Sequence, residues 1–422
     1  MHYKQSLYNY IKVGKEKVAI YNTYSNGIAI LDYNEYEKLL RIQDFNVIDT
    51  DIQEFVRQGF VIDTENDEQK IVNYCRYRDT FLKNRPIYRI LTTTSCNARC
   101  FYCYEHGIPV LTMSKKTAEN VADYIIMSAK NVDRITLNWF GGEPLLNPTI
   151  ISLIANKVRL ALGDKIVSST IITNASLFTK ELIRIAKREW NLTNIQISLD
   201  GLKEYHERRK AYTNILNSFD KTIEIVNCLL AEGLHVSLRL NYDKKNYEDI
   251  VKLVYYIKET FGNLSNLTCY AYPLFDSTNS NNHFYLCKED IPIYEKRMKD
   301  ALVECGYYNP LQTLPRRTNA CFATDPYSCV IDPHGDIYKC TMDMADLSRS
   351  IGNVKDGCML GERYVEWTTP VLPQKCQECI MLPICQGGCR AARLLKVDMN
   401  DCAIKKQSIE YMLNYILNFY AS

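Results

Sequence analysis

The chain has 422 residues, of which 46% are hydrophobic and 24% are charged, an ordinary balance for a globular protein of two or three domains. Its 51 basic and 49 acidic side chains leave a formal net charge of +2, so composition does not favour binding to nucleic acid or to a membrane surface. The sequence shows no apolar segment long enough for a transmembrane helix and no apolar stretch of a secretory signal, so we expect a cytoplasmic protein.

Residues 1–85 predict a small mixed module. The segment 17–32, KVAIYNTYSNGIAILD, indicates two short strands around the turn YSNG, and helical patterns follow at 33–42 and 49–59. FVIDTENDE, at 60–68, indicates a closing strand with a polar exit. This order favours a winged-helix-like α+β domain, although the near-neutral charge does not favour the usual DNA-binding use of that shape.

Residues 86–305 predict alternating strands and helices. Six β–α units follow one another in about 200 residues, which implies a parallel sheet closed or partly closed into a barrel. Eight units would make the full (β/α)8 barrel, so we expect a partial (β/α)6 barrel. The strands are expected to begin near residues 87, 134, 168, 194, 235 and 267.

Seventeen cysteines are unevenly distributed along the chain. Three lie between Cys96 and Cys103, and nine lie between Cys321 and Cys402. In a chain without a secretory signal, such clusters indicate metal ligands in a reducing compartment rather than disulfides. The other five cysteines are expected to be small buried hydrophobic residues.

The first cluster, CNARCFYC, follows the first barrel strand. Such barrels place their chemistry on the loops after the strands, and GGEP and SLDG follow the second and fourth strands, so all three segments are expected at one mouth. Structural zinc requires four ligands, whereas Cys96, Cys100 and Cys103 supply three. Three thiolates on an iron–sulfur cubane would leave one iron open, while zinc and plain packing are the alternatives.

The motif C-x3-C-x-aromatic-C, after the first strand of a six-unit β/α series, resembles the radical SAM superfamily. The resemblance implies a [4Fe–4S] cluster on Cys96, Cys100 and Cys103, whose fourth iron takes the amino and carboxylate groups of S-adenosylmethionine (SAM). One electron would then cleave SAM to a 5′-deoxyadenosyl radical that abstracts hydrogen from a substrate. The cofactor carries this chemistry, and the protein orients it.

Other motifs match those that surround SAM in this family. GGEP resembles the segment that contacts the methionine amino group of SAM. Tyr102 matches the aromatic residue beside adenine, and SLDG and LRLN match the polar ends of the fourth and fifth strands. The resemblance implies these SAM contacts: Tyr102, Gly141, Gly142, Glu143, Asn174, Ser198, Asp200, Lys210, Arg239 and Asn241.

One position departs from the family pattern. After SLDG, the family often has H-D-x-x-R, whose arginine pairs with the SAM carboxylate, but HERRK places Lys210 at that position. Lysine keeps the charge but loses the bidentate fork of arginine. Either Lys210 acts as a point charge, or Arg209 takes the role.

The C-terminal cysteines, in residues 306–422, resemble the SPASM extension of radical SAM enzymes. The pattern C-x2-C-x5-C-x3-C at 376–389 follows Cys321-x13-Gly335-x4-Cys340. The resemblance implies two auxiliary [4Fe–4S] clusters, for three in all. Auxiliary cluster I would take Cys321, Cys340 and Cys389, and auxiliary cluster II would take Cys376, Cys379, Cys385 and Cys402.

The fourth ligand of auxiliary cluster I stays open. Cys329 could complete the site, or it could be buried in a strand while the iron is left open for substrate. Cys358 is expected to be a bystander. Zinc is the alternative for this region, because C-x2-C is also a zinc-like spacing.

The whole layout resembles peptide maturases of ribosomally made natural products. Residues 1–85 are similar to the small PqqD-like domains that recognise leader peptides, which bind the leader by adding it as a strand to a sheet edge. The resemblance implies an enzyme of the sactipeptide or ranthipeptide type that installs a cross-link, such as a thioether, in a precursor peptide. It also implies a flavodoxin- or ferredoxin-type electron donor.

Two other functions compete with this prediction. One is oxidation of a Cys or Ser in a protein, as in anaerobic sulfatase maturation. The other is a metal-binding winged-helix adaptor without catalysis. An acid or base on the substrate side is not defined by any motif, and Glu105, His106 and Asp276 are candidates only because they follow strand ends.

Overall fold

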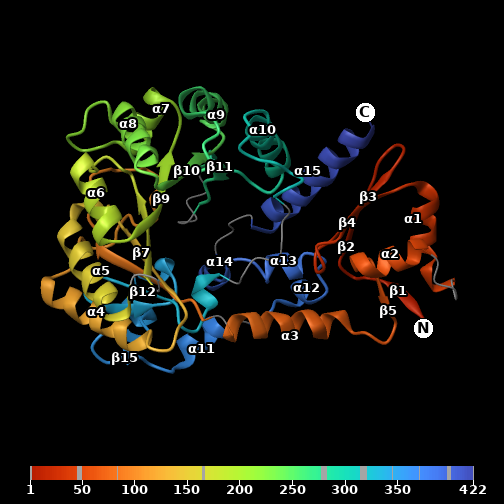
Figure 1. Cartoon of the computed structure of the whole chain (residues 1–422), viewed down its shortest axis with the longest axis horizontal. Coiled ribbons are helices and arrows are strands. Elements are labelled where there is room, and N and C mark those ends of the chain that lie inside the picture. Colours follow the sequence, from red (N-terminus) through yellow and green to blue (C-terminus); the bar gives the residue numbers. More distant parts are fainter. Residues whose placement is uncertain are drawn as a thin grey trace.

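A computed structural model describes residues 2–44, 50–82, 84–163, 167–276, 283–313, 321–344, 346–369, 371–396 and 401–421. The N-terminal module lies at one end of the molecule and the barrel at the other, with the cysteine-rich C-terminal segment between them (Figure 1). Asp49, the first residue of the expected second helix, lies outside the described residues.

Six parallel strands form the central sheet, in the spatial order β11-β10-β9-β8-β7-β6. They are β6 (Ile87–Thr93), β7 (Ile135–Gly141), β8 (Val167–Thr173), β9 (Leu192–Leu199), β10 (His235–Tyr242) and β11 (Leu267–Pro273). Within the described residues, β11 has no neighbour other than β10, so the sheet stays open. The predicted partial (β/α)6 barrel is therefore confirmed.

Helices cover the outer face of this sheet (Figure 1). They are α4 (Lys115–Ser128), α5 (Pro148–Leu162), α6 (Lys180–Glu189), α7 (Lys203–Lys210), α8 (Ser218–Ala231), α9 (Tyr247–Phe261) and α10 (Ile291–Glu304). Ser114 and Thr179 cap α4 and α6 by accepting backbone N–H groups, as expected for N-cap residues. In α5, Ile150, Ile154 and Val158 recur every fourth residue and are buried against the strands.

The C-terminal segment extends the barrel sheet. Strand β12 (Cys329–Ile331) pairs in parallel with β6, and β13 (Asp336–Tyr338), β14 (Gly352–Asn353) and β15 (Gly357–Cys358) follow in antiparallel pairs. Four short helices follow, with Cys376 in the second and Cys385 in the third. They are α11 (Glu362–Thr368), α12 (Gln374–Gln377), α13 (Leu382–Cys385) and α14 (Arg390–Leu395).

The N-terminal module contains the two predicted strands, which are β3 (Val18–Asn22) and β4 (Ile28–Leu31), and the closing strand β5 (Val61–Asp63). Three elements were not predicted. They are β1 (Tyr3–Gln5), which pairs with β5, β2 (Asn9–Val13), which pairs with β3, and the long helix α3 (Glu68–Phe81). The first two helices, α1 (Tyr33–Leu40) and α2 (Thr50–Gln58), pack on one face of the sheet β2-β3-β4.

The other face of that sheet packs on the end of the chain. The C-terminal helix α15 (Asp401–Ala421) buries Ile409, Met412 and Leu413 against Tyr10 and Tyr21. The first and last segments of the sequence therefore share one hydrophobic core. In the part of the chain that the structure describes, no helix is both long and apolar enough to cross a membrane.

Candidate functional site

The loop that carries the first three cysteines packs tightly on the end of β7. The Gly142 N–H donates to Thr93 O at 3.2 Å, and the Glu143 N–H donates to Ser95 O at 2.8 Å. A Cβ atom at Gly142 would lie 2.3 Å from Ser95 O and 2.5 Å from Thr94 O. Only glycine allows this approach, so GGEP holds the start of the cysteine loop in place.

Glu143 ties two strand ends together. Its buried carboxylate accepts hydrogen bonds from Thr173 Oγ1 at 2.6 Å, from the Asn174 N–H at 2.8 Å and from the Leu145 N–H at 3.1 Å. Burial raises its pKa to about 7 despite these bonds. The carboxylate thus joins the end of β7 to the end of β8.

Five predicted SAM contacts form one polar group at the ends of β9 and β10. Tyr102 Oη donates to Asp200 Oδ2 at 2.5 Å, and Asn241 Nδ2 donates to Asp200 Oδ1 at 3.1 Å. Lys210 Nζ donates to Ser198 Oγ at 2.6 Å and lies 3.8 Å from Asp200 Oδ1. The structure therefore brings Tyr102, Ser198, Asp200, Lys210 and Asn241 together beside the cysteine loop.

The structure distinguishes Lys210 from Arg209. Arg209 Nη2 lies 2.7 Å from Asp243 Oδ2 in a buried ion pair, and its guanidinium stacks 4.8 Å above the Phe101 ring. Lys210 faces Ser198 and Asp200 instead, and the Lys210 carbonyl oxygen accepts from the Arg99 N–H of the cysteine loop. Of the two alternatives, the point charge of Lys210 fits this arrangement.

Two predicted SAM contacts have buried polar atoms without partners. Arg239 Nε and Asn241 Oδ1 make no hydrogen bond within the described residues, and the Arg239 guanidinium lies 4.6 Å from the Tyr272 ring centre. A buried polar atom without a partner is costly, so these two atoms fit a site that receives a polar ligand such as SAM.

The three thiols have the donor chemistry of an iron–sulfur site. Burial raises the pKa of Cys96 and of Cys103 to about 11, so the thiolates need a nearby positive charge, which a metal centre supplies. Across the described ranges, no three Cys, His, Asp or Glu side chains lie close enough to hold a single metal ion.

The three acid–base candidates lie in different settings. Glu105 has a buried Oε1 without a hydrogen bond, and burial raises its pKa to about 7. His106 is exposed, and its Nε2 lies 2.7 Å from Cys100 O. Asp276, half-buried after β11, interacts electrostatically with Tyr285. None of these contacts assigns a proton-transfer role.

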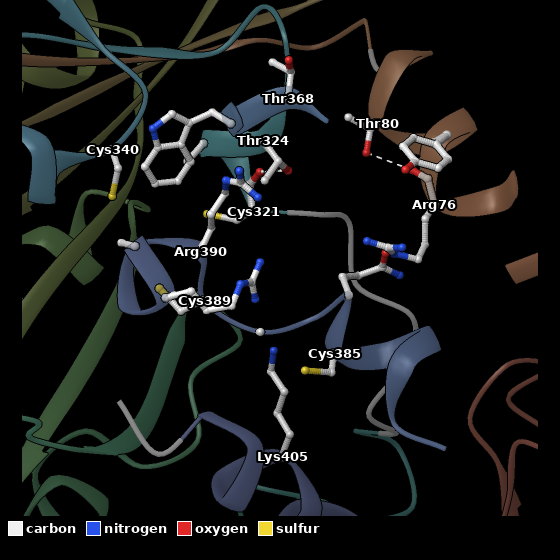
Figure 2. A pocket seen from close by; sticks show the side chains of 17 residues that line it. Arg76, Thr80, Cys321, Thr324, Cys340, Thr368, Cys385, Cys389, Arg390 and Lys405 are labelled. Carbon is white, nitrogen blue, oxygen red and sulfur yellow. Dashed lines mark hydrogen bonds between the residues drawn. The ribbon is translucent and has the colours of Figure 1, made fainter. Parts of the chain in front are cut away.

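A second group of cysteines lines a cavity of about 280 Å³ between α3, α11 and α14. Figure 2 shows Cys321, Cys340, Cys385 and Cys389 around it, together with basic side chains. Burial, and then the charges of Cys321, Asp343 and Cys389, raise the pKa of Cys340 to about 12. The three cysteines expected for auxiliary cluster I are thus neighbours.

The cysteines expected for auxiliary cluster II are partly brought together. Burial raises the pKa of Cys376, and Cys402 and Cys379 lie close enough to raise it further. Cys385, the fourth member, lines the cavity described above. The two predicted sets therefore adjoin each other.

Cys329 lies elsewhere. It is buried on β12 beside Tyr124, whose hydroxyl also lies 3.1 Å from Cys358 Sγ. Cys329 is not among the described residues that line the cavity. This placement favours the alternative in which Cys329 is a buried strand residue.

The barrel sequence matches a known family. Residues 90–257 match the radical SAM superfamily, and this range contains Cys96, Cys100 and Cys103. Over these residues the barrel matches a radical SAM domain. This match implies one [4Fe–4S] cluster and SAM, and it indicates an enzyme rather than an adaptor without catalysis.

Curated relatives match the radical SAM domain or more. Human molybdenum cofactor biosynthesis protein 1 is 31% identical over 177 residues, which cover 39% of this chain and 27% of that protein. A cysteine-type anaerobic sulfatase-maturating enzyme of Clostridium perfringens is 21% identical over 366 residues, which cover 77% of this chain and 95% of the enzyme. The match to the second relative therefore extends well beyond the barrel.

Solved structures share the fold at low sequence identity. Native anSMEcpe with bound AdoMet aligns with a TM-score of 0.64 and 18% identity, over 79% of this chain and 99% of that chain. Streptococcus suis SuiB bound to precursor peptide SuiA aligns with a TM-score of 0.55 and 16% identity, over 94% of this chain and 98% of that chain. The SuiB fold thus corresponds to nearly the whole of this chain.

Two residues of the site were not predicted from the sequence. Asp243 fixes Arg209, and Arg76 of the N-terminal module lines the cysteine cavity. Asp243 directly follows β10, so its position at a strand end was a usable signal. No local signal places Arg76 near cysteines that lie more than 200 residues further along the chain.

Proposed function

We propose that the chain is a radical SAM peptide maturase that installs a cross-link, with a thioether as the expected bond, in a ribosomally made precursor peptide. Cys96, Cys100 and Cys103 would hold a [4Fe–4S] cluster, which supplies the electron that cleaves SAM to a 5′-deoxyadenosyl radical. The radical would abstract hydrogen from a carbon of the peptide.

This chain's own residues would bind and orient SAM. Lys210 would supply the positive charge for the SAM carboxylate, and Gly142 the close backbone approach. Arg239 and Asn241 would satisfy their unpartnered buried atoms on the cofactor. Tyr102, held by Asp200, would lie against adenine.

The C-terminal cysteines would hold two auxiliary clusters. Cys321, Cys340 and Cys389 around the cavity would bind auxiliary cluster I, and Cys376, Cys379, Cys385 and Cys402 would bind auxiliary cluster II. The thiol donors and the basic side chains around them fit an anionic iron–sulfur group.

The observation that carries the peptide proposal is the open edge of β4 in the N-terminal module. Among the described residues, β4 pairs only with β3, while its Ile28 and Ile30 side chains are partly buried. Asn22 N–H bonds to Gly27 O, and the alternation of an antiparallel ladder then turns the N–H groups of Ile28 and Ile30 outward. We infer that the leader peptide adds here as a further strand.

The test is an anaerobic reaction with SAM, a reductant and a short Cys-containing peptide encoded beside the gene. We expect the peptide to lose the mass of two hydrogens. Ile30→Pro removes one outward N–H group, so it should abolish the mass loss of the peptide while SAM cleavage persists. Ile30→Val keeps that N–H group, so the peptide should still lose two hydrogens. Unmodified neighbouring peptides in every reaction would contradict the proposal.

Oxidation of a Cys or Ser in a protein is the second candidate. It is favoured by the match to the sulfatase-maturating enzyme over 95% of that protein. A Cys peptide from a sulfatase would then be oxidised equally by the enzyme and by Ile30→Pro, because this reaction does not use the β4 edge.

A further inference from the structure

The N-terminal module contributes a helix to the cysteine cavity. Arg76, Tyr77 and Thr80 of α3 line the cavity together with Cys321, Cys340 and Cys389. Figure 2 shows the Arg76 guanidinium on the side of the cavity that faces Cys385. A helix that precedes the barrel therefore forms part of the wall of a site whose thiols follow the barrel.

Arg76 is held in the wall rather than on the surface. The residue is 8% exposed, its Nη1 donates to Asn73 Oδ1 at 3.1 Å, and its carbonyl oxygen accepts from Thr80 Oγ1 at 2.9 Å. Arg78 lies on the same helix, but its side chain is 43% exposed and pairs with Asp79 at 2.8 Å. Two arginines of one helix thus differ in burial and in the group they face.

The charged side chains that line the cavity are all basic. They are Arg76, Arg390, Arg393 and Lys405, and no Asp or Glu of the described residues lines the cavity. The buried Nε of Arg390 has no hydrogen-bond partner among the described residues. Such a wall attracts an anion, and charges interact more strongly in a buried site than in water.

We propose that Arg76 tunes the reduction potential of the auxiliary cluster bound at this cavity, which Cys321, Cys340, Cys385 and Cys389 line, an inference that rests on the proposed auxiliary clusters. An iron–sulfur cluster gains one negative charge when it accepts an electron, and its potential depends on nearby charge and burial. A fixed buried cation stabilises the reduced state, so it raises the potential. Arg390 follows a ligand directly, whereas Arg76 belongs to the N-terminal module and links that module to the cluster.

The test measures midpoint potentials rather than turnover. The full-length protein is reconstituted anaerobically, its iron is counted, and its clusters are titrated with EPR detection. Arg76→Gln is expected to lower the midpoint of one auxiliary cluster by about 59 mV, which is a tenfold smaller equilibrium constant for a one-electron reduction. Arg78→Gln, the exposed control on the same helix, is expected to leave every midpoint unchanged.

Arg76→Lys keeps the positive charge and is expected to keep the wild-type midpoint potential. This expectation can be tested even if the Arg76→Gln protein does not retain its iron. Unchanged midpoints in an iron-replete Arg76→Gln protein would overturn the proposal, as would an Arg76→Lys shift equal to that of Arg76→Gln. If the wild type holds iron for one cluster only, the auxiliary clusters themselves are disproved. A normal iron content with unshifted midpoints disproves only the role of Arg76.

Discussion

Arg209 and Lys210 are adjacent in the chain but face different buried carboxylates, since Arg209 pairs with Asp243 and Lys210 lies 3.8 Å from Asp200. The motif narrowed the charge expected to face SAM to these two positions, but their helix alone does not fix which one turns toward the strands. The choice depends on Asp243, a buried carboxylate from another strand end that binds Arg209. Partners of this kind come from tertiary packing, which no local pattern encodes.

Lys210→Met is expected to weaken SAM binding. The substitution removes a buried positive charge that donates to Ser198, and a hydrogen bond of a charged group contributes about 1.5–3 kcal/mol, so the dissociation constant should rise by roughly tenfold or more. Anaerobic equilibrium binding of SAM measures this effect. Arg208→Met, an exposed position on the same helix, is the control, and equal affinities of both variants would contradict the role of Lys210.

His206 is expected to make stability depend on pH. It is fully buried against Tyr212 and Phe219, and burial lowers its pKa to about 3. Because this folded-state pKa lies below the unfolded value, the stabilisation is complete above about pH 6.5 and is lost as pH falls toward 3. From pH 7 to 5.5, the melting temperature of the wild type should therefore fall more steeply than that of His206→Phe. Parallel curves would show that His206 is not a buried neutral residue.

At the scale of elements, alternating patterns predicted the barrel well because each strand and helix buries one regular face. Helix α3 was missed because its buried face carries Glu68, Arg76 and Thr80, so its sequence looks like a solvated exit from the module. Strand β2 was missed because tyrosine, lysine and asparagine residues obscure its alternation. Both elements are stabilised by distant partners.

Gly142→Ala is expected to disrupt the cysteine loop without affecting the C-terminal cavity. The added Cβ would collide with the backbone oxygens of Ser95 and Thr94, which cannot rotate away as a side chain can. We predict a loss of SAM cleavage of at least tenfold, with the iron of the proposed auxiliary clusters retained. Gly361→Ala, whose Cβ would meet nothing within 4 Å, is the matched control. Full SAM cleavage by Gly142→Ala would show that the close approach is dispensable.

At the scale of the whole molecule, the sequence predicted three parts in their order along the chain but not their packing. The N-terminal sheet buries one face against α15, and α3 reaches the cysteine cavity. These contacts join residues hundreds of positions apart, and therefore no periodicity reveals them. They place the proposed leader-binding edge and the proposed auxiliary clusters in one continuous structure.

Cleavage of SAM at the first cysteine cluster is tested by measuring the formation of 5′-deoxyadenosine from SAM by anaerobically reduced protein, with iron counted in the same sample. The wild type should form 5′-deoxyadenosine. The combined Cys96→Ala, Cys100→Ala and Cys103→Ala variant should form none, yet should keep the iron of both proposed auxiliary clusters. If that variant still produces 5′-deoxyadenosine, the first cysteine cluster is not the site of SAM cleavage.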